Sequence, residues 1–552
     1  MPRLRTVTAA WLLLVAALPM TGAAAWALLA AADATAWRAL AQHPLTPWAL
    51  GYSLWTGLAS TTLAWLGCAL LLSQGFVRRS LARTLRLLPV MLATPHAAFA
   101  IGLAFLLSPS GWALRIVSPW LTQWAVPPPW PTVQDPWGLG LIAALTVKEL
   151  PFLLWAAGTQ LLRGDVHHRL AAEHRIAQTL GYTSSRAFWH VVWPQLSSRM
   201  VWPLLAVLAY GLTVVDMAIV IGPASPPPLA VLAWQWLQDA DPAVNAQGAA
   251  AGALLALTVT LCAALAVLLH KRVAPLWWTG WRNQGHRGVP ERCNPRAPCL
   301  NVAPLLWPLI VLYGAVLLAL AVASVAGVWP FPQAWPQQWS LSAWHSVWSS
   351  RSTLGHTLGL AACSSALALA WAVAWLELAP RRWDTVLRPL LYLPLVVPAV
   401  LWVLGVYGLA LHGHLEGRWS GLLLAHTMAT LPYVLLTLSP AYQGFDPRYA
   451  RVSASLGHGP WRFLIFVKWP LLRRALAASA AVGFAVSVAQ YVPTLYVGAG
   501  RFATVTTEAV TLASGGQRSL TSAYAWLQFL LPVGGFALAA WVGRPRRFRV
   551  SP

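Results

Sequence analysis

Acidic side chains are the scarcest of the groups in this chain that could carry chemistry. Of 552 residues only 14 are Asp or Glu, against 37 Lys and Arg. Most of these acids fall between long apolar runs, and only Glu149 and Asp216 lie well inside such runs. No carboxylate cluster suited to a membrane-embedded transferase or protease is present. The sequence therefore predicts no catalytic residues.

The cysteines and the glycine pattern predict neither a metal site nor a cofactor. Three cysteines, Cys68, Cys262 and Cys363, lie in apolar runs and are typical of small core residues. Cys293 and Cys299 lie in a basic stretch, where a metal ion would need more ligands than this pair supplies. There is also no G-x-x-x-x-G-K-[ST] phosphate loop. If ATP drives this protein, another chain must bind it.

Asp216 is the acid with the clearest functional potential. It lies in the apolar stretch LTVVDMAIVIGP. An ionisable residue inside a membrane span costs about 2.5–3.5 kcal/mol and usually faces a cavity or a partner. Asp216 is therefore a candidate for the translocation path, with a structural pair as the alternative. A 276-residue offset aligns it with Val492, next to Gln490 and Tyr491, which we also assign to the path, at the interface between the two halves.

Other polar residues in apolar surroundings have a structural interpretation. Lys148 and Glu149 are adjacent, so on a helix they point about 100° apart and do not pair with each other. Each is expected to find a partner on another helix. The histidines His96, His356 and His426 are expected to be hydrogen-bonded core residues.

Composition places the chain in the membrane. Hydrophobic residues make up 58% and charged residues only 9% of it, whereas soluble domains contain about 25% charged residues. A helix needs about 20 apolar residues to cross a bilayer. This predicts an all-α polytopic protein with about twelve spans, at 8–31, 50–73, 87–108, 138–160, 201–222, 246–269, 303–326, 354–378, 389–411, 420–440, 475–497 and 521–542.

The basic residues predict how these spans are oriented. With the N-terminus inside, the segments between spans hold most Lys and Arg on the cytoplasmic side, and the outer segments hold Arg38, Arg115, Arg351, Arg418, Arg501 and Arg518. This follows the positive-inside rule and predicts that both termini are cytoplasmic. The first span could pass for a signal peptide, but its apolar run is long, which favours an uncleaved helix. Because the basic residues are dispersed, the net charge of +23 does not indicate nucleic-acid binding.

The sequence is a tandem repeat of two six-span units. We predict a first unit at 1–269, a cytoplasmic linker at 270–302 that is rich in Pro, Gly and charge, and a second unit at 303–552. Spacings recur between the halves: Pro95 precedes Gly102 by seven residues, as Pro398 precedes Gly405. Repetition on this scale indicates two related units in the membrane.

One polar, basic loop recurs in each half, and we call these loop 1 (163–197) and loop 2 (441–474). Each contains a short helix that ends at Leu-Gly, at Gly181 and at Gly457, where a left-handed residue would stop it. A Val follows ten residues after each Gly, at Val191 and Val467, and a Pro thirteen residues after it, at Pro194 and Pro470. A second helical piece is expected through Phe188. Apolar pairs four residues apart, Ile176 with Leu180 and Val452 with Leu456, would share one helix face and call for a protein partner.

The two loops resemble the E-A-A-x-x-x-G loop of binding-protein-dependent ABC importer permeases, and two copies on one chain resemble the fused permeases of the thiamine and ferric-iron type. The family's Glu is replaced by Arg175 and Arg451, and its first Ala by Ile176 and Val452. Its second Ala is kept at Ala177 and becomes Ser453 in loop 2.

The resemblance implies two type I ABC permease units in a bacterial inner membrane. It also implies that two ATPase subunits dock on loops 1 and 2 and that a periplasmic binding protein delivers a small solute. Stretches such as QYVPTLYVGAGRFATVTTEAVTLASGG resemble a branch assigned to thiamine or related solutes, with ferric iron or an oxyanion as the alternative.

Two other classes remain as rivals. An ion-coupled 6 + 6 secondary transporter of the major facilitator kind usually carries G-x-x-x-D-R-x-G after its second span. The loop here, SQGFVRRSLARTLR, lacks the Asp. A membrane enzyme is the other rival, and the sequence offers it no catalytic group.

Overall fold

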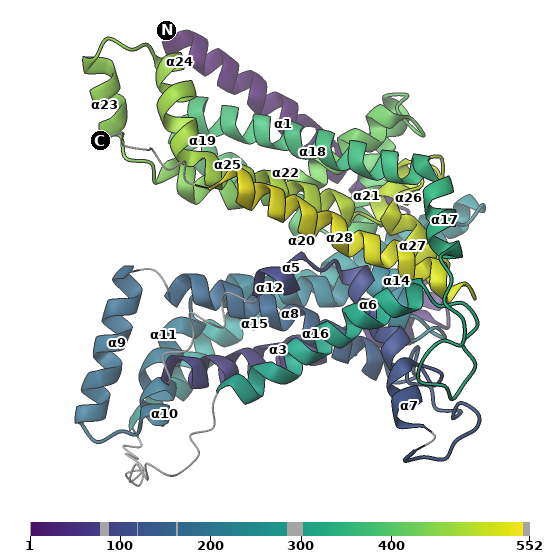
Figure 1. Ribbon diagram of the computed structural model, residues 1–552. Coiled ribbons are helices and arrows are strands. Elements are labelled where there is room, and N and C mark those ends of the chain that lie inside the picture. Colours follow the sequence, from purple (N-terminus) through teal and green to yellow (C-terminus); the bar gives the residue numbers. More distant parts are fainter. Residues whose placement is uncertain (1, 78–87, 119, 162–163, 284–301, 545–552) are drawn as a thin grey trace, which may run out of the picture. The chain divides into compact units, whose positions relative to one another are not determined.

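A computed structural model describes residues 2–77, 88–118, 120–161, 164–283 and 302–544, and the described chain is almost entirely helical (Figure 1). Its only β-type pairing in those ranges is a single bridge between Ala326 and Trp339. The helices form two compact units. Unit 1 combines Met1–Asp33 with Ser340–Pro552, and unit 2 is Ala34–Trp339. This confirms the predicted all-α class.

Unit 2 contains the helices of the middle of the chain. They are α2 (Ala34–Gln42), α3 (Thr46–Val77), α5 (Leu88–Ala93), α6 (His96–Leu107), α7 (Trp112–Val117), α8 (Leu139–Leu161), α9 (Gly164–Thr179), α10 (Ser184–Ala187), the π-helical turn η1 (Phe188–Val192), α11 (Trp193–Ser197), α12 (Val201–Thr213), α13 (Asp216–Ile221), α14 (Leu229–Leu237), α15 (Pro242–Asn283) and α16 (Val302–Ser324).

Unit 1 is made of the first helix and the helices of the C-terminal part. They are α1 (Pro2–Ala30), α17 (Ser342–Ser349), α18 (Arg351–Leu378), α19 (Arg381–Leu391), α20 (Leu393–Val396), α21 (Ala399–His412), α22 (Trp419–Gln443), α23 (Arg448–Ser455), α24 (Pro460–Phe463), the π-helical turn η2 (Leu464–Lys468), α25 (Trp469–Val488), α26 (Val492–Val497), α27 (Val505–Ala513) and α28 (Arg518–Val542).

The number of spans agrees with the prediction. Ten helices among the described residues are long and apolar enough to cross a membrane, and the number is twelve if two sharply bent helix pairs each count as one span. The bends are 71° between residues 184–197 and 201–213, and 110° between residues 381–396 and 399–412. A proline explains the second bend, since Pro398 directly precedes α21 and cannot donate a backbone hydrogen bond.

The second half repeats the first without insertion or deletion over a long stretch. Six elements of unit 2, α10, η1, α11, α13, α14 and α15, begin 276 residues before α24, η2, α25, α26, α27 and α28 of unit 1, and α12, between α11 and α13, corresponds to the later part of α25. The end of loop 1 and the helices that follow it therefore have a position-by-position counterpart in loop 2 and its helices.

The compact units differ from the predicted units at their first helix. The prediction placed 1–269 in one unit and 303–552 in the other. Instead α1 packs on α21 and α18 of unit 1, and α16 packs on α6 and α3 of unit 2. The physical reason lies in close approaches that only glycine allows. A Cβ on Gly405 of α21 would lie 2.0 Å from the carbonyl oxygen of Ala23 of α1. In unit 2, a Cβ on Gly102 of α6 would lie 2.7 Å from Val316 of α16.

The first part of the predicted linker, which begins at residue 270, is helical. Residues 270–283 continue α15 as regular helix, which runs to Asn283 through Pro275. Residues 284–301 of the predicted linker, with Cys293 and Cys299, lie outside the described residues.

Candidate functional site

Both loops contain the same helix-ending motif. After α9, the Gly181 amide donates to the Gln178 carbonyl oxygen at 3.0 Å and the Tyr182 amide to the Ala177 carbonyl oxygen at 3.1 Å. After α23, Gly457 and His458 make the equivalent bonds, to Ala454 at 3.0 Å and to Ser453 at 3.1 Å. This pair of bonds is the Schellman motif, which needs a left-handed residue at its turn. Gly181 has φ of 92° and Gly457 has φ of 75°, as their sequence position predicts.

The second helical piece of each loop contains a π turn that the sequence did not predict. It forms η1 in loop 1 and η2 in loop 2, and in both the next residue donates across five positions, from Trp193 to Phe188 and from Trp469 to Leu464. Pro194 and Pro470 come directly after these residues and have no amide hydrogen, so the α-helical ladder must be interrupted there. The proline that lies thirteen residues after each glycine was the feature of the sequence that could have predicted this interruption of the helix.

The predicted contact residues divide into an exposed set and a buried set. Ile176 and Leu180, at the end of α9, and Val452 and Leu456, at the end of α23, are each between 58% and 68% exposed. Between them, Ala177 is 6% and Ser453 is 5% exposed. The small residues of the motif thus face the protein, and the large apolar residues face outward.

The remaining predicted loop residues vary more between the copies. Arg175 and Arg451, which stand where the family has Glu, are exposed. Val191 and Val467 are half-buried within the π turns, and Phe188 is fully buried. Pro194 is buried, whereas Pro470 is exposed.

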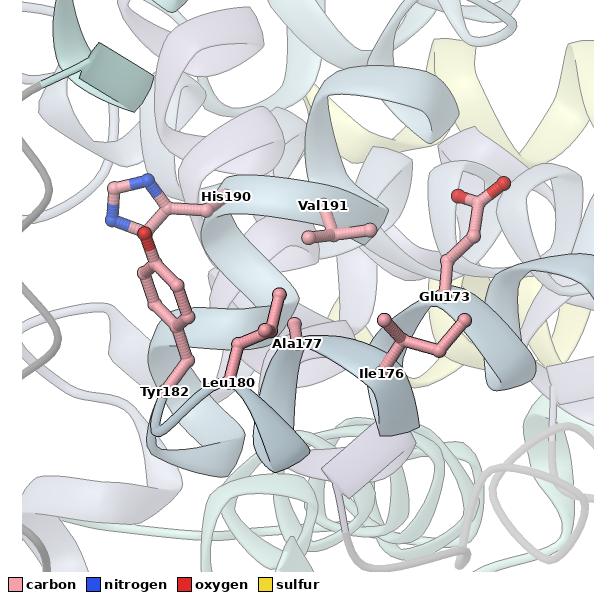
Figure 2. A pocket seen from close by; sticks show the side chains of 7 residues that line it. All are labelled: Glu173, Ile176, Ala177, Leu180, Tyr182, His190 and Val191. Atoms are coloured by element: carbon pink, nitrogen blue, oxygen red, sulfur yellow. The ribbon is translucent and has the colours of Figure 1, made fainter.

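An open hollow of about 290 Å³ lies between α9 and η1 in loop 1 (Figure 2). Its lining residues are Glu173, Ile176, Ala177, Leu180, Tyr182, His190 and Val191. Glu173 stands at one end of the hollow, where Gln195 Nε2 donates to its carboxylate at 2.5 Å and Arg169 lies 3.7 Å away. At the other end the rings of Tyr182 and His190 lie 5.8 Å apart. The hollow is thus apolar in its middle and polar at both ends.

Aromatic packing joins loop 1 to the transmembrane helices of unit 2. The ring of Phe76 in α3 lies 5.7 Å from Phe188 and 5.3 Å from His174. His174 Nε2 in turn donates to the Ser184 carbonyl oxygen at 2.9 Å, which ties α9 to α10. Loop 1 is therefore anchored to α3 without an ion pair in these contacts.

Loop 2 is joined to unit 1 by a charged network. Lys468 Nζ in η2 lies 2.6 Å from Glu377 Oε2 at the end of α18, and the two side chains are 13% and 24% exposed. The Tyr442 hydroxyl of α22 donates to the same carboxylate at 2.9 Å, and the Lys468 ammonium lies 4.1 Å from the Tyr442 ring centroid. The sequence did not predict this network, because its members are far apart in the chain and have no matching pair in the first half.

The three predicted path residues lie at equivalent helix breaks. Asp216 is the first residue of α13 and is partly exposed, while Gln490 and Tyr491 lie between α25 and α26. Tyr491 is 8% exposed, and Gln490 Nε2 donates to the Val486 carbonyl oxygen at 3.2 Å. Asp216 belongs to unit 2, and Gln490 and Tyr491 belong to unit 1.

The polar residues that were predicted to need partners each contact a polar group in the structure. Lys148 Nζ donates to the Met91 carbonyl oxygen of α5 at 2.9 Å. Glu149 Oε1 lies 3.2 Å from His96 Nε2 of α6. His426 is a buried core histidine, as expected, bonded to Ser487 at 2.8 Å and Thr494 at 3.0 Å. His356 lies 3.3 Å from the Ala503 carbonyl oxygen.

Comparison with known proteins agrees with this arrangement of paired loops on two helical units. The family model described as "Binding-protein-dependent transport system inner membrane component" matches residues 364–544. The inner membrane ABC transporter permease protein YnjC of Escherichia coli (strain K12) is 35% identical over 543 residues, which cover 96% of this chain and 95% of that protein. The chain therefore belongs to the family of binding-protein-dependent ABC transporter permeases, in agreement with the resemblance of its loops.

Two further relatives match over shorter stretches. The thiamine transport system permease protein ThiP of Escherichia coli (strain K12) is 34% identical over 126 residues, which cover 21% of this chain and 23% of that protein. The molybdenum transport system permease protein ModB of Azotobacter vinelandii is 31% identical over 86 residues, or 16% of this chain and 38% of that protein. Two rival classes were considered from the sequence, an ion-coupled secondary transporter and a membrane enzyme. Both differ from the family to which this chain belongs.

Proposed function

We propose that this chain is the fused permease of an ATP-driven type I importer of a bacterial inner membrane. Loops 1 and 2 lie on the cytoplasmic side and each binds one copy of a separate ATPase subunit. A periplasmic binding protein delivers the solute, which moves between the helices into the cytoplasm. The chain itself performs no catalysis in this scheme.

The paired geometry of the loops is the observation that supports this proposal. Each loop presents two large apolar side chains, Ile176 with Leu180 or Val452 with Leu456, next to a Schellman turn of the same form. Exposed apolar pairs on a polar, basic loop are costly unless a partner covers them. Burying each such side chain would contribute about 1.5–3 kcal/mol to docking.

For the solute, we propose a small thiamine-like molecule. The partial similarity to ThiP supports this choice. The partial similarity to ModB keeps an oxyanion as the alternative, and ferric iron is the other.

Co-purification with the ATPase tests the docking role. The variants are Ile176→Ser with Leu180→Ser, Val452→Ser with Leu456→Ser, and all four together. We expect each pair to lower ATPase recovery, the fourfold variant to abolish it, and high salt to change little because the contacts are apolar. Val386→Ser on α19 is the control, since Val386 is 79% exposed but lies outside both loops. Full ATPase recovery with the fourfold variant would refute the assignment.

A further inference from the structure

An exposed, tryptophan-rich surface lies at the end of unit 2 opposite loop 1, and we call it the aromatic rim. It consists of residues 108–118 and 120–138, which connect α6 to α8 and include α7, and of residues 325–339, which follow α16. The rim precedes the first residue of α8, whereas loop 1 follows its last. Accordingly, α7 and α9 lie at opposite ends of the long helices of unit 2 (Figure 1).

The charged side chains of the rim are turned inward. Arg115 and Asp135 are the charged residues of its described part, and they are only 4% and 6% exposed. Arg115 donates to carbonyl oxygens of both rim segments, at 2.9 Å to Ser110 and at 2.8 Å to Pro330. Asp135 accepts from the first two amides of α8, at 2.7 and 2.8 Å. Both charges thus hold the rim together and neither marks its surface.

Large apolar side chains occupy the exposed positions of the rim. Between α6 and α8 they include Trp120 (86% exposed), Leu121 (82%), Val126 (72%) and Trp137 (72%). After α16 they are Val328, Trp335 and Trp339, each 56% or 57% exposed. Exposed apolar side chains in such density, without exposed charge among the described residues, call for a partner that covers them.

The rim continues the lipid-facing side of a membrane-spanning helix. Helix α3 is long and apolar enough to cross a bilayer. Its side chains Trp48, Trp55, Leu66 and Leu70 recur at helical spacing and are between 49% and 66% exposed, so they form one apolar stripe. The Trp55 indole nitrogen donates to the Trp137 carbonyl oxygen at 3.0 Å. The stripe that lipid covers on α3 therefore leads directly to the rim.

The chemistry of the rim fits the headgroup layer of a bilayer. Pro127, Pro128, Pro129, Pro131 and Pro136 have no amide hydrogen, so this non-helical stretch has few backbone donors to remove from water. An exposed Trp can place its ring among the acyl chains while its N–H donates to a lipid phosphate or ester oxygen, which is why Trp gathers at membrane interfaces. A docking surface for a protein usually has a polar periphery, which the rim lacks in its described part.

We propose that the aromatic rim lies in the lipid headgroup layer of the leaflet opposite loop 1, as an anchor of unit 2 that does not cross the bilayer. In the proposed orientation this is the outer leaflet, and only that assignment rests on the proposed function. Because the described rim has no exposed basic side chain, the contact uses the indole rings and not the charge of the lipid. It therefore does not require anionic lipids.

Spin-label depth measurements on the full chain test the proposal. A cysteine-free version carries one nitroxide at Trp120→Cys, Val126→Cys or Trp137→Cys, in nanodiscs of zwitterionic phosphatidylcholine and with no other transporter subunit. Collisions with oxygen, which concentrates in lipid, are compared with collisions with a water-soluble nickel chelate. We expect the ratio of oxygen to nickel accessibility to be severalfold higher at the three rim positions than at a water-exposed control position. Addition of anionic lipid should leave this order unchanged.

Asp239→Cys is the matched control, because Asp239 is an exposed residue of another connection in unit 2, between α14 and α15. Its label should be readily accessible to the nickel chelate. The proposal fails if the rim labels are as accessible to nickel as the label at Asp239, which is also the result expected if the rim serves to dock a protein. The measurement involves neither ATPase nor solute, so its failure would leave the importer assignment standing.

Discussion

Lys468 in loop 2 and Glu377 at the end of α18 form an ion pair with 2.6 Å between Nζ and Oε2, across 91 positions of sequence. The pair connects the loop that we propose as an ATPase contact to a helix long enough to cross the membrane. In loop 1 the position equivalent to Lys468 is Val192, and aromatic rings make the connection. The two loops thus share a backbone but differ in how they are attached.

Replacing only one partner of this ion pair should destabilise unit 1. Lys468→Met leaves Glu377 partly buried without its cation, and Glu377→Leu leaves Lys468 in the same condition. We expect about 2–4 kcal/mol for each change, less for the double variant than for the sum, because only single changes leave an unpaired charge. Thermal unfolding of the purified chain in detergent measures this.

An exposed ion pair provides the control for that cycle. Arg448 and Asp446 lie 4.0 Å apart, with side chains 81% and 47% exposed. Arg448→Gln should change the stability by less than about 0.5 kcal/mol, as exposed pairs usually do. Equal effects of Lys468→Met and Arg448→Gln would contradict a structural role of the buried pair.

The left-handed turn of loop 2 can be tested without a steric clash. A Cβ on Gly457 would meet nothing within 4 Å, so Gly457→Ala acts only through its φ of 75°. We expect a local cost of about 1–2 kcal/mol. Hydrogen exchange at the end of α23 should become faster, and ATPase recovery should fall.

Gly459 is the matched control for this change. It lies two residues further on, also has open space around it, and has φ of −67°. Gly459→Ala should leave both hydrogen exchange and ATPase recovery close to wild type. If the two alanine variants behave alike, the Schellman turn does not matter for docking.

The close packing of α1 on α21 predicts a third set of effects. A Cβ on Gly405 would lie 2.0 Å from the Ala23 carbonyl oxygen, and one on Gly408 would lie 1.9 Å from the Trp26 ring. Either Gly→Ala change must push α1 away, with a cost of about 1–3 kcal/mol or more for overpacking. Gly355→Ala in α18, where a Cβ meets nothing within 4 Å, should be neutral or slightly stabilising. Detergent thermostability compares the three variants, and equal midpoints would disprove the close contact.

Orientation can be tested by labelling single cysteines in a cysteine-free version of the chain. Asp239→Cys and His414→Cys should react with a membrane-impermeant reagent from the periplasm, whereas Gln178→Cys on α9 should react only after the membrane is opened. All three positions are exposed, so accessibility does not confound the result. Labelling of Gln178→Cys from outside would overturn the proposed topology.

The sequence predicted the features that depend on local chemistry. Apolar run length predicted the spans, and the glycines at Gly181 and Gly457 predicted the helix ends because few other residues accept a positive φ. It did not predict which helix packs on which, so it gave no sign that α1 packs in the same compact unit as α21. Hydropathy is the same whichever partner a helix has, and the informative residues, Gly405 and Gly408, are far from α1 in sequence.

The surroundings of Asp216 were predicted only in part. Asp216 stood out because an acid in an apolar run is rare. His96 was not linked to it, because only the packing of α6 against α13 brings the two residues close. The π turns were missed for a different reason: the missing amide of Pro194 and Pro470 requires a break in the ladder but does not specify its form.

The first helix of each half of the sequence, α1 or α16, packs in the compact unit formed by the other half. This has a consequence for biosynthesis. Helix α1 ends at Ala30, but α21, on which it packs, begins only at Ala399. At about 5–20 residues per second, a ribosome needs tens of seconds to make the chain in between. During that interval the stripe of α1 that contains Gly22, Ala23 and Trp26 must rest against lipid or a chaperone, while unit 2 can already assemble around α3 and α8. Unit 1, which contains α1, can therefore be completed only after the helices of unit 2 have been made.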